Sequence, residues 1–309
     1  MNTQSNAIPE SPLQSQVTAA VPIPAPRRMY WCVRREFWEN RSLYLAPLAV
    51  AVLILAGSLI STIHLPEKMR AAALDPMQQH QLIEQPYMFA ALLLMFTTLV
   101  VGVFYSLDAL YGERRDRSVL FWKSLPVSDL TTVLAKASIP VLVLPLLTFA
   151  ITVVTQALML LIGTVRLLGS GVSVATLWGH LALFQMWLML LYHLVALHGL
   201  WWAPFWGWLL LVSAWSRRAP VLWATLPLLA IGLVEKIAFN TSHFGTLLGY
   251  QFMGGPEGTA PTGDPMSMAA LTPIAPAEFL LRPGLWIGLA LAAAFLAAAV
   301  RLRRYRDPI

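Results

Sequence analysis

The sequence predicts an all-α integral membrane protein with six transmembrane helices. Of its 309 residues, 58% are hydrophobic and only 12% are charged, too few ionisable groups to cover a water-soluble globule of this size. The mean hydropathy is +0.65. Twelve tryptophans and eight tyrosines agree with a bilayer environment, because such rings are enriched where hydrocarbon meets headgroups. The formal charge of +6 could suggest a nucleic-acid partner, but the basic residues follow membrane topology, so we expect none.

The N-terminal residues 1–28 are expected to form a disordered cytoplasmic tail, followed by a single transmembrane domain over 29–309. The tail is polar and proline-rich, and it lacks the apolar stretch behind a basic start that is typical of a signal peptide. Cys32 is the single cysteine, which excludes an internal disulfide and a CxxC metal site.

Apolar stretches predict where the chain crosses the membrane, since a bilayer core needs about 20 apolar residues per helix. Five stretches are clear: 43–63, 87–107, 137–163, 221–239 and 284–300. Between the third and fourth of these, no Lys, Arg, Asp or Glu occurs from Leu167 to Ser216. We predict one long span over 177–214, kinked or partly re-entrant near Pro204.

The distribution of basic residues orients these spans. One crossing over 177–214 keeps Arg217 and Arg218 with the other basic clusters, as the positive-inside rule favours, whereas two crossings would separate them. We therefore expect a multi-pass protein of the inner membrane with both termini in the cytoplasm. Few basic residues fall on the outer side: Lys68, Arg70, Arg166, Lys236 and Arg282. The outer segment 240–283 contains GGPEGTAPTGDP and is expected to be irregular.

The stretch YGERRDRSVLFWKSLPVSD, residues 111–129, gathers charges and aromatic residues between two apolar runs. On a helix starting at Glu113, the side chains of Ser118, Phe121, Trp122 and Leu125 share one face, and charged residues occupy the other. Such a helix can lie along the cytoplasmic membrane surface and present its charges to a soluble partner. The alternative is a basic loop that only sets topology, but topology does not require the acidic residues.

Two segments resemble the permease of a type-2 ABC exporter: MYWCVRREFWENRSLYLAP at 29–47 and ERRDRSVLFWKSLPVSDLTTVLAKA at 113–137. The resemblance covers the chain from about Met29 to its C-terminus. It implies an N-terminal interfacial elbow helix, and its residues would be Trp31, Arg34, Arg35, Phe37 and Trp38. It also implies a cytoplasmic coupling helix between spans two and three, and the contacts to a separate ATPase would be Glu113, Arg114, Arg115, Asp116 and Arg117.

The chain departs from this family in its long fourth hydrophobic region. It also lacks the strongly hydrophobic re-entrant hairpin that often precedes the last span. It has no GxxxxGK[ST] phosphate cradle, so ATP and Mg²⁺ would be bound by the partner ATPase. The resemblance implies two copies of that ATPase and a second permease copy, expected as a homodimer. We expect no catalytic residue, metal or cofactor in the chain itself.

Polar residues inside the spans form stripes that could line a substrate path or mediate helix packing. The candidates for the path are Thr98, Tyr105, Thr148, Thr152, Thr155, Gln156, Gln185, Tyr192 and His193. Two further hypotheses remain open at this point. The chain could be an intramembrane enzyme acting on lipid-like substrates through His193 and Tyr192, or a non-transporting anchor that recruits a cytoplasmic protein.

Overall fold

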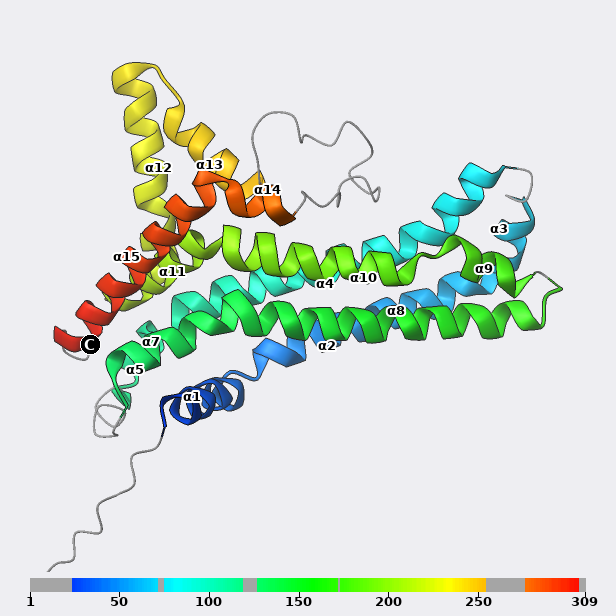
Figure 1. Cartoon of the computed structure of the whole chain (residues 1–309), viewed down its shortest axis with the longest axis horizontal. Helices are drawn as coiled ribbons and strands as arrows, with labels where there is room; N and C mark the ends of the chain where they lie inside the picture. Colours follow the sequence, from blue (N-terminus) through cyan, green and yellow to red (C-terminus); the bar gives the residue numbers. More distant parts are fainter. Residues whose placement is uncertain (1–23, 72–74, 119–126, 172, 254–275, 306–309) are drawn as a thin grey trace, which may run out of the picture.

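The computed structural model describes residues 24–71, 75–118, 127–171, 173–253 and 276–305. Over these residues the regular structure is helical throughout, with no strand. Six helical stretches are long and apolar enough to cross a membrane: 42–71, 77–115, 129–168, 174–201, 220–239 and 283–305. The predicted all-helical membrane architecture is therefore confirmed (Figure 1).

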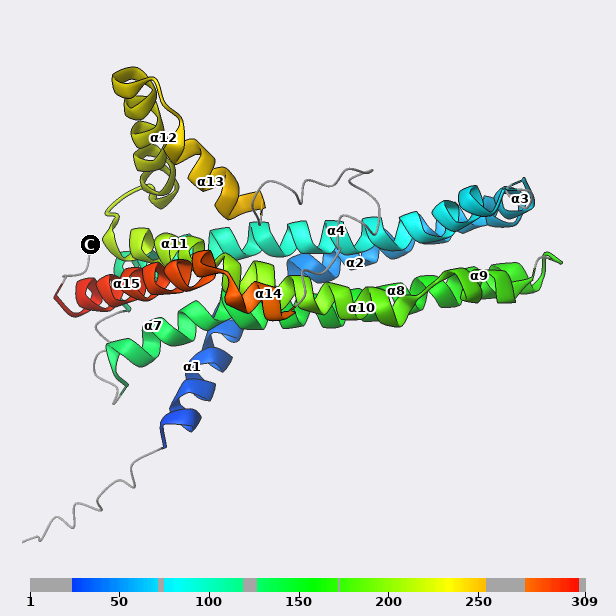
Figure 2. The ribbon, with the colours of Figure 1, turned by 45° about the horizontal axis from the view of Figure 1, so that its top comes forward.

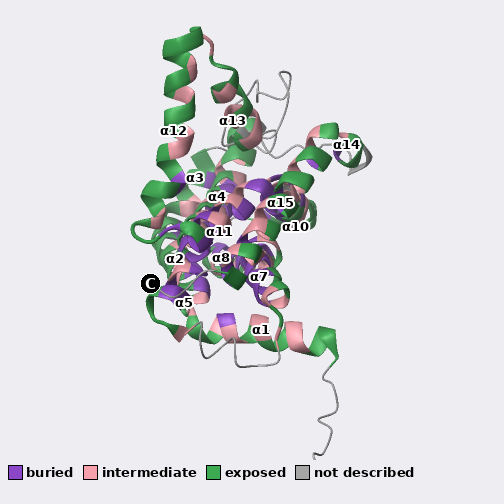
Figure 3. Ribbon diagram, turned by 90° about the vertical axis from the view of Figure 1, so that its left-hand side faces the viewer, coloured by how far each residue is buried: buried purple, intermediate pink, exposed green. Residues whose placement is uncertain are grey.

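The first helix, α1 (Ala25–Glu39), lies crosswise to the other helices at one end of the molecule (Figure 3). It begins inside the expected tail, so residues 25–28 are already helical, whereas residues 1–23 lie outside the described residues. Pro26 occupies the second position of α1, where a missing backbone N–H costs nothing.

The first three spans form an antiparallel bundle whose long helices lie side by side (Figures 1 and 2). The first span comprises α2 (Ser42–Ser61), η1 (Thr62–His64) and α3 (Leu65–Ala71). The second comprises α4 (Pro76–Asp108) and α5 (Tyr111–Arg115), and the third comprises α7 (Asp129–Ser138), the π-helical η3 (Ile139–Val143) and α8 (Leu144–Leu168). The Ser128 hydroxyl accepts a hydrogen bond from the Thr131 amide at 3.1 Å, an N-terminal cap for α7.

The fourth span is long and broken, as predicted. It runs through α9 (Val174–His180), α10 (Leu183–Tyr192), the π-helical η4 (His193–Trp201) and α11 (Ala203–Trp215). One break falls at Trp202, two residues before Pro204 in the first turn of α11. Proline is tolerated there but not in a helix interior, which explains why the helix restarts at this point.

The last part of the chain forms a helical hairpin and the final span. α12 (Pro220–Phe239) and α13 (His243–Met253) extend away from the bundle, and α14 (Pro276–Leu281) precedes α15 (Pro283–Tyr305) (Figures 1 and 2). The prediction that 240–283 is irregular is wrong for α13 and α14. The Glu235 carboxylate stabilises the hairpin by accepting the amide hydrogens of His243 at 2.6 Å and Phe244 at 2.8 Å.

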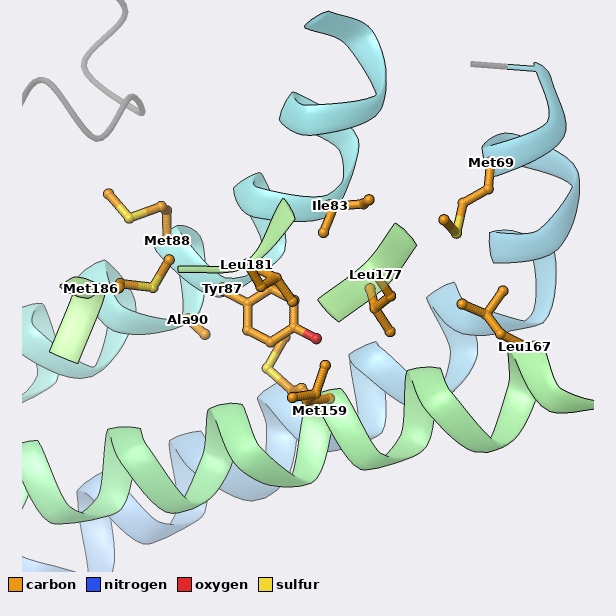
Figure 4. Packing of buried hydrophobic residues seen from close by; sticks show 11 residues of the cluster. Met69, Ile83, Tyr87, Met88, Ala90, Met159, Leu167, Leu177, Leu181 and Met186 are labelled. Atoms are coloured by element: carbon orange, nitrogen blue, oxygen red, sulfur yellow. The ribbon is translucent and has the colours of Figure 1, made fainter. Parts of the chain in front are cut away.

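Buried side chains follow the axis of the bundle, while its outer surface is largely apolar and exposed (Figure 3). At the end remote from α1, Met69, Ile83, Tyr87, Met159 and Leu177 pack together from four different helices (Figure 4). Apolar exposure of this kind suits helices that face lipid. α11 and α15 approach closely because Gly207 has no side chain: a Cβ there would lie 3.2 Å from the Ala292 carbonyl oxygen.

Candidate functional site: a buried ion network beneath the first helix

Two buried carboxylates meet where α1 crosses the ends of α5 and α7. Glu36 on α1 is 1% exposed and Glu113 on α5 is 8% exposed. The Lys136 ammonium on α7 bridges them, with Nζ 2.9 Å from Glu36 Oε1 and 3.2 Å from Glu113 Oε1. The Tyr105 hydroxyl of α4 donates a hydrogen bond to Glu36 Oε2 at 2.8 Å. Residues far apart in sequence therefore share one buried charge cluster.

Two arginines complete the cluster. Arg35 Nη2 lies 2.7 Å from Glu36 Oε1 and 3.0 Å from Glu113 Oε1. Arg303, near the end of α15, forms an ion pair with Glu113 through Nη1 and with Asp129 through Nε, the latter at 3.0 Å. We call this set of residues the ion network. It comprises six charged residues and one tyrosine: Arg35, Glu36, Tyr105, Glu113, Asp129, Lys136 and Arg303.

The charges of the ion network balance, because Arg35, Lys136 and Arg303 oppose Glu36, Glu113 and Asp129. Such balance is needed inside a protein, where an unpaired ion costs several kcal/mol. The ion network fixes the relative positions of the helices more than it adds to the net stability of the fold. The reason is that the attraction within a buried ion pair only roughly offsets the cost of removing its two ions from water. The network fixes five separate elements, α1, α4, α5, α7 and α15, in one relative arrangement.

Burial and neighbouring charges shift the pKa values of three side chains on α1, those of Arg35, Glu39 and Cys32. Burial acts to lower the pKa of the Arg35 guanidinium, but the carboxylates of Glu36, Glu39 and Glu113 outweigh it and raise the pKa. Arg35 thus stays charged under all ordinary conditions. Partial burial raises the pKa of Glu39, while Arg35, 3.5 Å away, acts in the opposite direction. Burial likewise raises the pKa of the Cys32 thiol, which is therefore protonated at neutral pH.

A second connection joins the corner between α4 and α5 to the end of α11. The Arg114 guanidinium donates hydrogen bonds to the Ser213 carbonyl oxygen at 3.1 Å and to the Ser216 carbonyl oxygen. The Ser213 hydroxyl accepts the amide hydrogens of Leu110 at 3.0 Å and Tyr111 at 2.9 Å. These bonds satisfy backbone groups that helix termini leave unpaired, and they attach the corner to the end of the fourth span.

The structure divides the charged stretch between buried and exposed residues. Glu113 and Arg114, two of the expected ATPase contacts, are buried and paired within the chain. Arg115, Asp116 and Arg117 are exposed. The continuous helix predicted from Glu113 is wrong, because α5 ends at Arg115 and Arg117 adopts a left-handed backbone with φ 55°. Phe121, Trp122, Lys123 and Leu125 lie outside the described residues.

The predicted elbow residues divide between two faces of α1. Arg35 faces the ion network and Phe37 stacks on Tyr44 of α2 with ring centroids 6.4 Å apart. On the exposed side, the Arg34 guanidinium lies 5.1 Å from the Trp31 ring and 4.7 Å from the Trp38 ring. An exposed set of tryptophans with an arginine between them is typical of a helix at a membrane interface.

Four threonines of the predicted path are buried between or within helices. Thr98 and Thr148 are fully buried, and their hydroxyls hydrogen-bond to each other between α4 and α8. Thr152 and Thr155 are also buried and donate to carbonyl oxygens one turn earlier in α8, at 2.8 Å and 2.7 Å. Thr98 and Thr148 thus join two helices, whereas Thr152 and Thr155 bond within one.

Gln156 also connects helices. Its amide nitrogen donates to the Tyr87 carbonyl oxygen at 2.9 Å, and its amide oxygen accepts from the Trp187 indole nitrogen at 2.7 Å. Tyr105 belongs to the ion network, and His193 is half-buried in η4. Gln185 and Tyr192 of the predicted path line an apolar groove beside α14.

Sequence reasoning missed Glu36, Asp129 and Arg303 as site residues and treated Lys136 only as the start of the third span. The sequence could have pointed to Glu36, because it is an acidic residue between basic residues on a helix expected at the membrane surface. The sequence could not show that Arg303 pairs with Glu113, since the two residues are 190 positions apart. Among the described residues, no three His, Cys, Asp or Glu side chains come together as a metal site requires.

Fold and site together define an all-helical protein with the architecture of a multi-pass membrane protein, whose first helix is held on the bundle by buried ion pairs. No family model, curated protein or solved structure matches the chain.

Proposed function

We propose that the chain is the transmembrane permease subunit of an ATP-driven exporter and that the ion network couples it to a separate ATPase. The observation that carries the proposal is the convergence of five elements on Glu113 and its partners. Glu113 lies at the start of the charged stretch, two residues before the exposed Arg115. A partner that displaces this stretch would therefore displace α1, α7 and α15 together.

The division between exposed and buried charges suggests how coupling works. Arg115, Asp116 and Arg117 are available for contacts with a soluble subunit, while Glu113 and Arg114 connect the same segment to the spans. ATP binding by the partner would favour one arrangement of the spans over the other, a population shift that needs no contact with substrate. Glu113 then acts as a positioning residue rather than as a docking contact.

Two π-helical segments, η3 and η4, lie next to each other in the third and fourth spans, and the two spans can bend there. η3 of the third span packs against η4 of the fourth, and a Cβ on Gly199 would lie only 2.7 Å from the Val141 carbonyl oxygen. π-Helical segments are rare and occur frequently at functional sites. We infer that the spans pivot here when the network end of the bundle moves.

The complete exporter would contain two copies of the ATPase, which bind ATP and Mg²⁺, and two copies of this permease. We place it in the inner membrane with both termini in the cytoplasm. The support is that the basic residues near the ion network outnumber those at the far end of the bundle, as the positive-inside rule requires for a cytoplasmic face.

The test is purification of the tagged chain from its native membrane in mild detergent, with identification of the proteins that co-purify and an assay of ATP hydrolysis. We expect a P-loop ATPase with the wild type. A variant with Arg115→Glu and Arg117→Glu should lose that subunit while keeping its membrane insertion. The matched control is Arg166→Glu, an exposed arginine at the opposite end of α8, which should retain it. Retention of the ATPase by the double variant would contradict the docking assignment, and absence of any ATPase after co-expression would contradict the exporter.

A further inference from the structure

One face of α1 points away from the bundle and carries only aromatic and basic side chains. α1 lies crosswise to the spans (Figure 3), so its axis runs along the membrane plane when the spans cross it. Its rotation is fixed, because the buried Glu36 carboxylate binds Lys136 and Tyr105 on the bundle side. At about 100° per residue, five exposed residues turn away from Glu36 and form the outward face of α1: Arg27, Tyr30, Trp31, Arg34 and Trp38.

The aromatic residues of the outward face suit the headgroup region of a bilayer. Tyr30, Trp31 and Trp38 are 58%, 48% and 66% exposed. Each ring has an apolar body and a polar N–H or O–H group, and such residues gather where hydrocarbon meets water. A helix with aromatic residues and arginines on its surface lies in the membrane interface. Exposure of these rings is therefore explained by contact with lipid.

The charges of the outward face are all positive. Arg27 and Arg34 are seven residues apart on it, and the exposed Arg41 follows after seven more. Within the described part of the chain, none of these three arginines has a carboxylate at ion-pair distance. The exposed acid of α1, Glu39, pairs instead with Arg35 at 3.5 Å. Three unopposed positive charges favour an anionic surface, and each basic residue close to such a surface strengthens attachment about fivefold.

Arg34 favours anionic over zwitterionic lipids. Its guanidinium lies against two indole rings, 5.1 Å from the Trp31 ring and 4.7 Å from the Trp38 ring. Indole rings are the groups that attract a quaternary ammonium such as choline, but here a positive charge already occupies a place beside both. A stacked guanidinium keeps N–H groups free at its edge, and these can donate a bidentate pair of hydrogen bonds to a phosphate.

We propose that the outward face of α1, together with Arg41, is a binding surface for anionic phospholipids of the adjoining leaflet. Arg27, Arg34 and Arg41 contact the lipid phosphates, and Trp31 and Trp38 lie among the glycerol backbones. The proposal goes beyond the exporter function and does not depend on it, because the exposed residues and their charges belong to this chain alone. One helix then joins the lipid surface on one side to the ion network on the other.

The test is photolabelling of the full chain, without any ATPase, in phosphatidylcholine nanodiscs that contain a trace of one of two probes. The probes are phosphatidylglycerol and phosphatidylcholine, each with the same diazirine close to its head group. Mass spectrometry compares their labelling yields on residues 25–41. We expect phosphatidylglycerol to label this segment several-fold more at low salt, and the preference should largely disappear in about 1 M NaCl, where screening limits the range of charges to about 3 Å.

Two outcomes of this measurement would overturn the proposal. Equal labelling by the two probes at low salt would show that the outward face does not select anionic lipids. Absence of label from both probes would show that lipid does not reach this face, and its occupant would then be a protein partner.

Variants of the three arginines locate the effect. Arg27→Gln/Arg34→Gln/Arg41→Gln should bring the yields of the two probes on residues 25–41 close to equality. Arg27→Lys/Arg34→Lys/Arg41→Lys keeps the charges and should retain most of the preference. An unchanged preference in the glutamine variant would refute the site.

The matched control is Arg217→Gln/Arg218→Gln/Arg301→Gln, which removes the same charge from exposed arginines near the same end of the molecule. It should leave the preference on residues 25–41 unchanged, and an equal loss in this control would show that net charge, not the outward face, attracts the probe. Because no ATPase is present, failure here leaves the coupling proposal standing, and failure to find an ATPase leaves the lipid surface standing.

Discussion

The Lys136 ammonium contacts carboxylates from two different elements, Glu36 of α1 and Glu113 of α5, and it is only 3% exposed. A buried charge of this kind depends on its partners, because removal of one member leaves the others uncompensated in a medium that solvates them poorly. Glu113 uses both of its carboxylate oxygens in this network. One oxygen pairs with Arg303, and the other pairs with Lys136 and Arg35.

We expect Lys136→Met to destabilise the folded chain by about 3–5 kcal/mol, because it leaves Glu36 and Glu113 short of one positive charge. Thermal or denaturant-induced unfolding in detergent measures the loss. Lys68→Met, at an exposed lysine at the far end of the bundle, is the matched control and should change stability by less than about 1 kcal/mol. The double variant Glu36→Gln/Lys136→Met should recover part of the loss, and the absence of any coupling between the two sites would show that they do not share one network.

Cys32 is a native reporter of the position of α1. Because burial raises the pKa of its thiol, the reactive thiolate is scarcer at pH 7 than in the unfolded chain, so a water-soluble maleimide should react slowly. Raising the pH increases the thiolate fraction and should speed the reaction. Glu36→Gln removes the carboxylate that holds α1 on Lys136 and Tyr105, and it should increase the labelling rate several-fold at constant pH.

Glu39→Gln on the same helix is the control for this measurement. Glu39 is exposed, and its single ion pair with Arg35 is long at 3.5 Å, so the loss of its charge should leave the labelling rate of Cys32 nearly unchanged. Equal rates in the Glu36 and Glu39 variants would contradict the assignment of Glu36 as the residue that docks α1.

The third and fourth spans each contain a π-helical segment, and the two segments pack against each other at Val141 and Gly199. Pro140 in η3 and Pro204 in the first turn of α11 lack backbone N–H groups near this contact. The regular hydrogen-bond pattern is therefore relaxed in both helices at similar depth, which leaves them able to bend relative to their outer halves.

We expect Gly199→Ala to force η3 and η4 apart, because the added methyl group would lie 2.7 Å from the Val141 carbonyl oxygen. Overpacking of this kind costs about 1–3 kcal/mol, and transport driven by the ATPase should fall further than stability does. Gly57→Ala in α2 is the control, since its Cβ would meet nothing within 4 Å and alanine favours a helix. A Gly199→Ala protein with wild-type stability and transport would rule out the contact as a pivot.

The fourth span decides the topology of the whole chain. α10, η4 and α11 follow one another in a single passage along the bundle (Figure 1), and the end of α11 is attached to the corner of α4 and α5 through Ser213. Arg217 and Arg218 thus lie at the same end of the molecule as Arg303. This agrees with one crossing over 177–214 and not with two.

Cysteines introduced in a Cys32→Ser background measure this arrangement directly. Arg218→Cys and Arg304→Cys should react with a membrane-impermeant maleimide only in inside-out vesicles, and Arg166→Cys, at the far end of α8, only in intact cells. The six-span arrangement has two crossings between these positions, 220–239 and 283–305, which return the chain to the same side. Reaction of Arg218→Cys and Arg304→Cys from opposite sides would require an odd number of crossings between them and would refute the six-span arrangement.

The sequence by itself determined the all-helical class, the position of the spans and the break near Pro204. These features depend on apolar runs and on residues within one or two helical turns, where the physical cause lies in adjacent residues. The same local reasoning singled out the charged stretch that begins at Glu113 but could not establish whether a charged residue is exposed or buried.

Only the tertiary structure decided that Glu113 faces inward, that Arg303 pairs with it, and that Thr98 and Thr148 bond to each other between α4 and α8. It also showed that the region expected to be irregular contains α13 and α14, held in part by Glu235. The reason is that a charge meets its partner across a helix–helix contact, here over as many as 190 residues of sequence. Periodicity gives the face on which a side chain lies, whereas packing decides what that face meets.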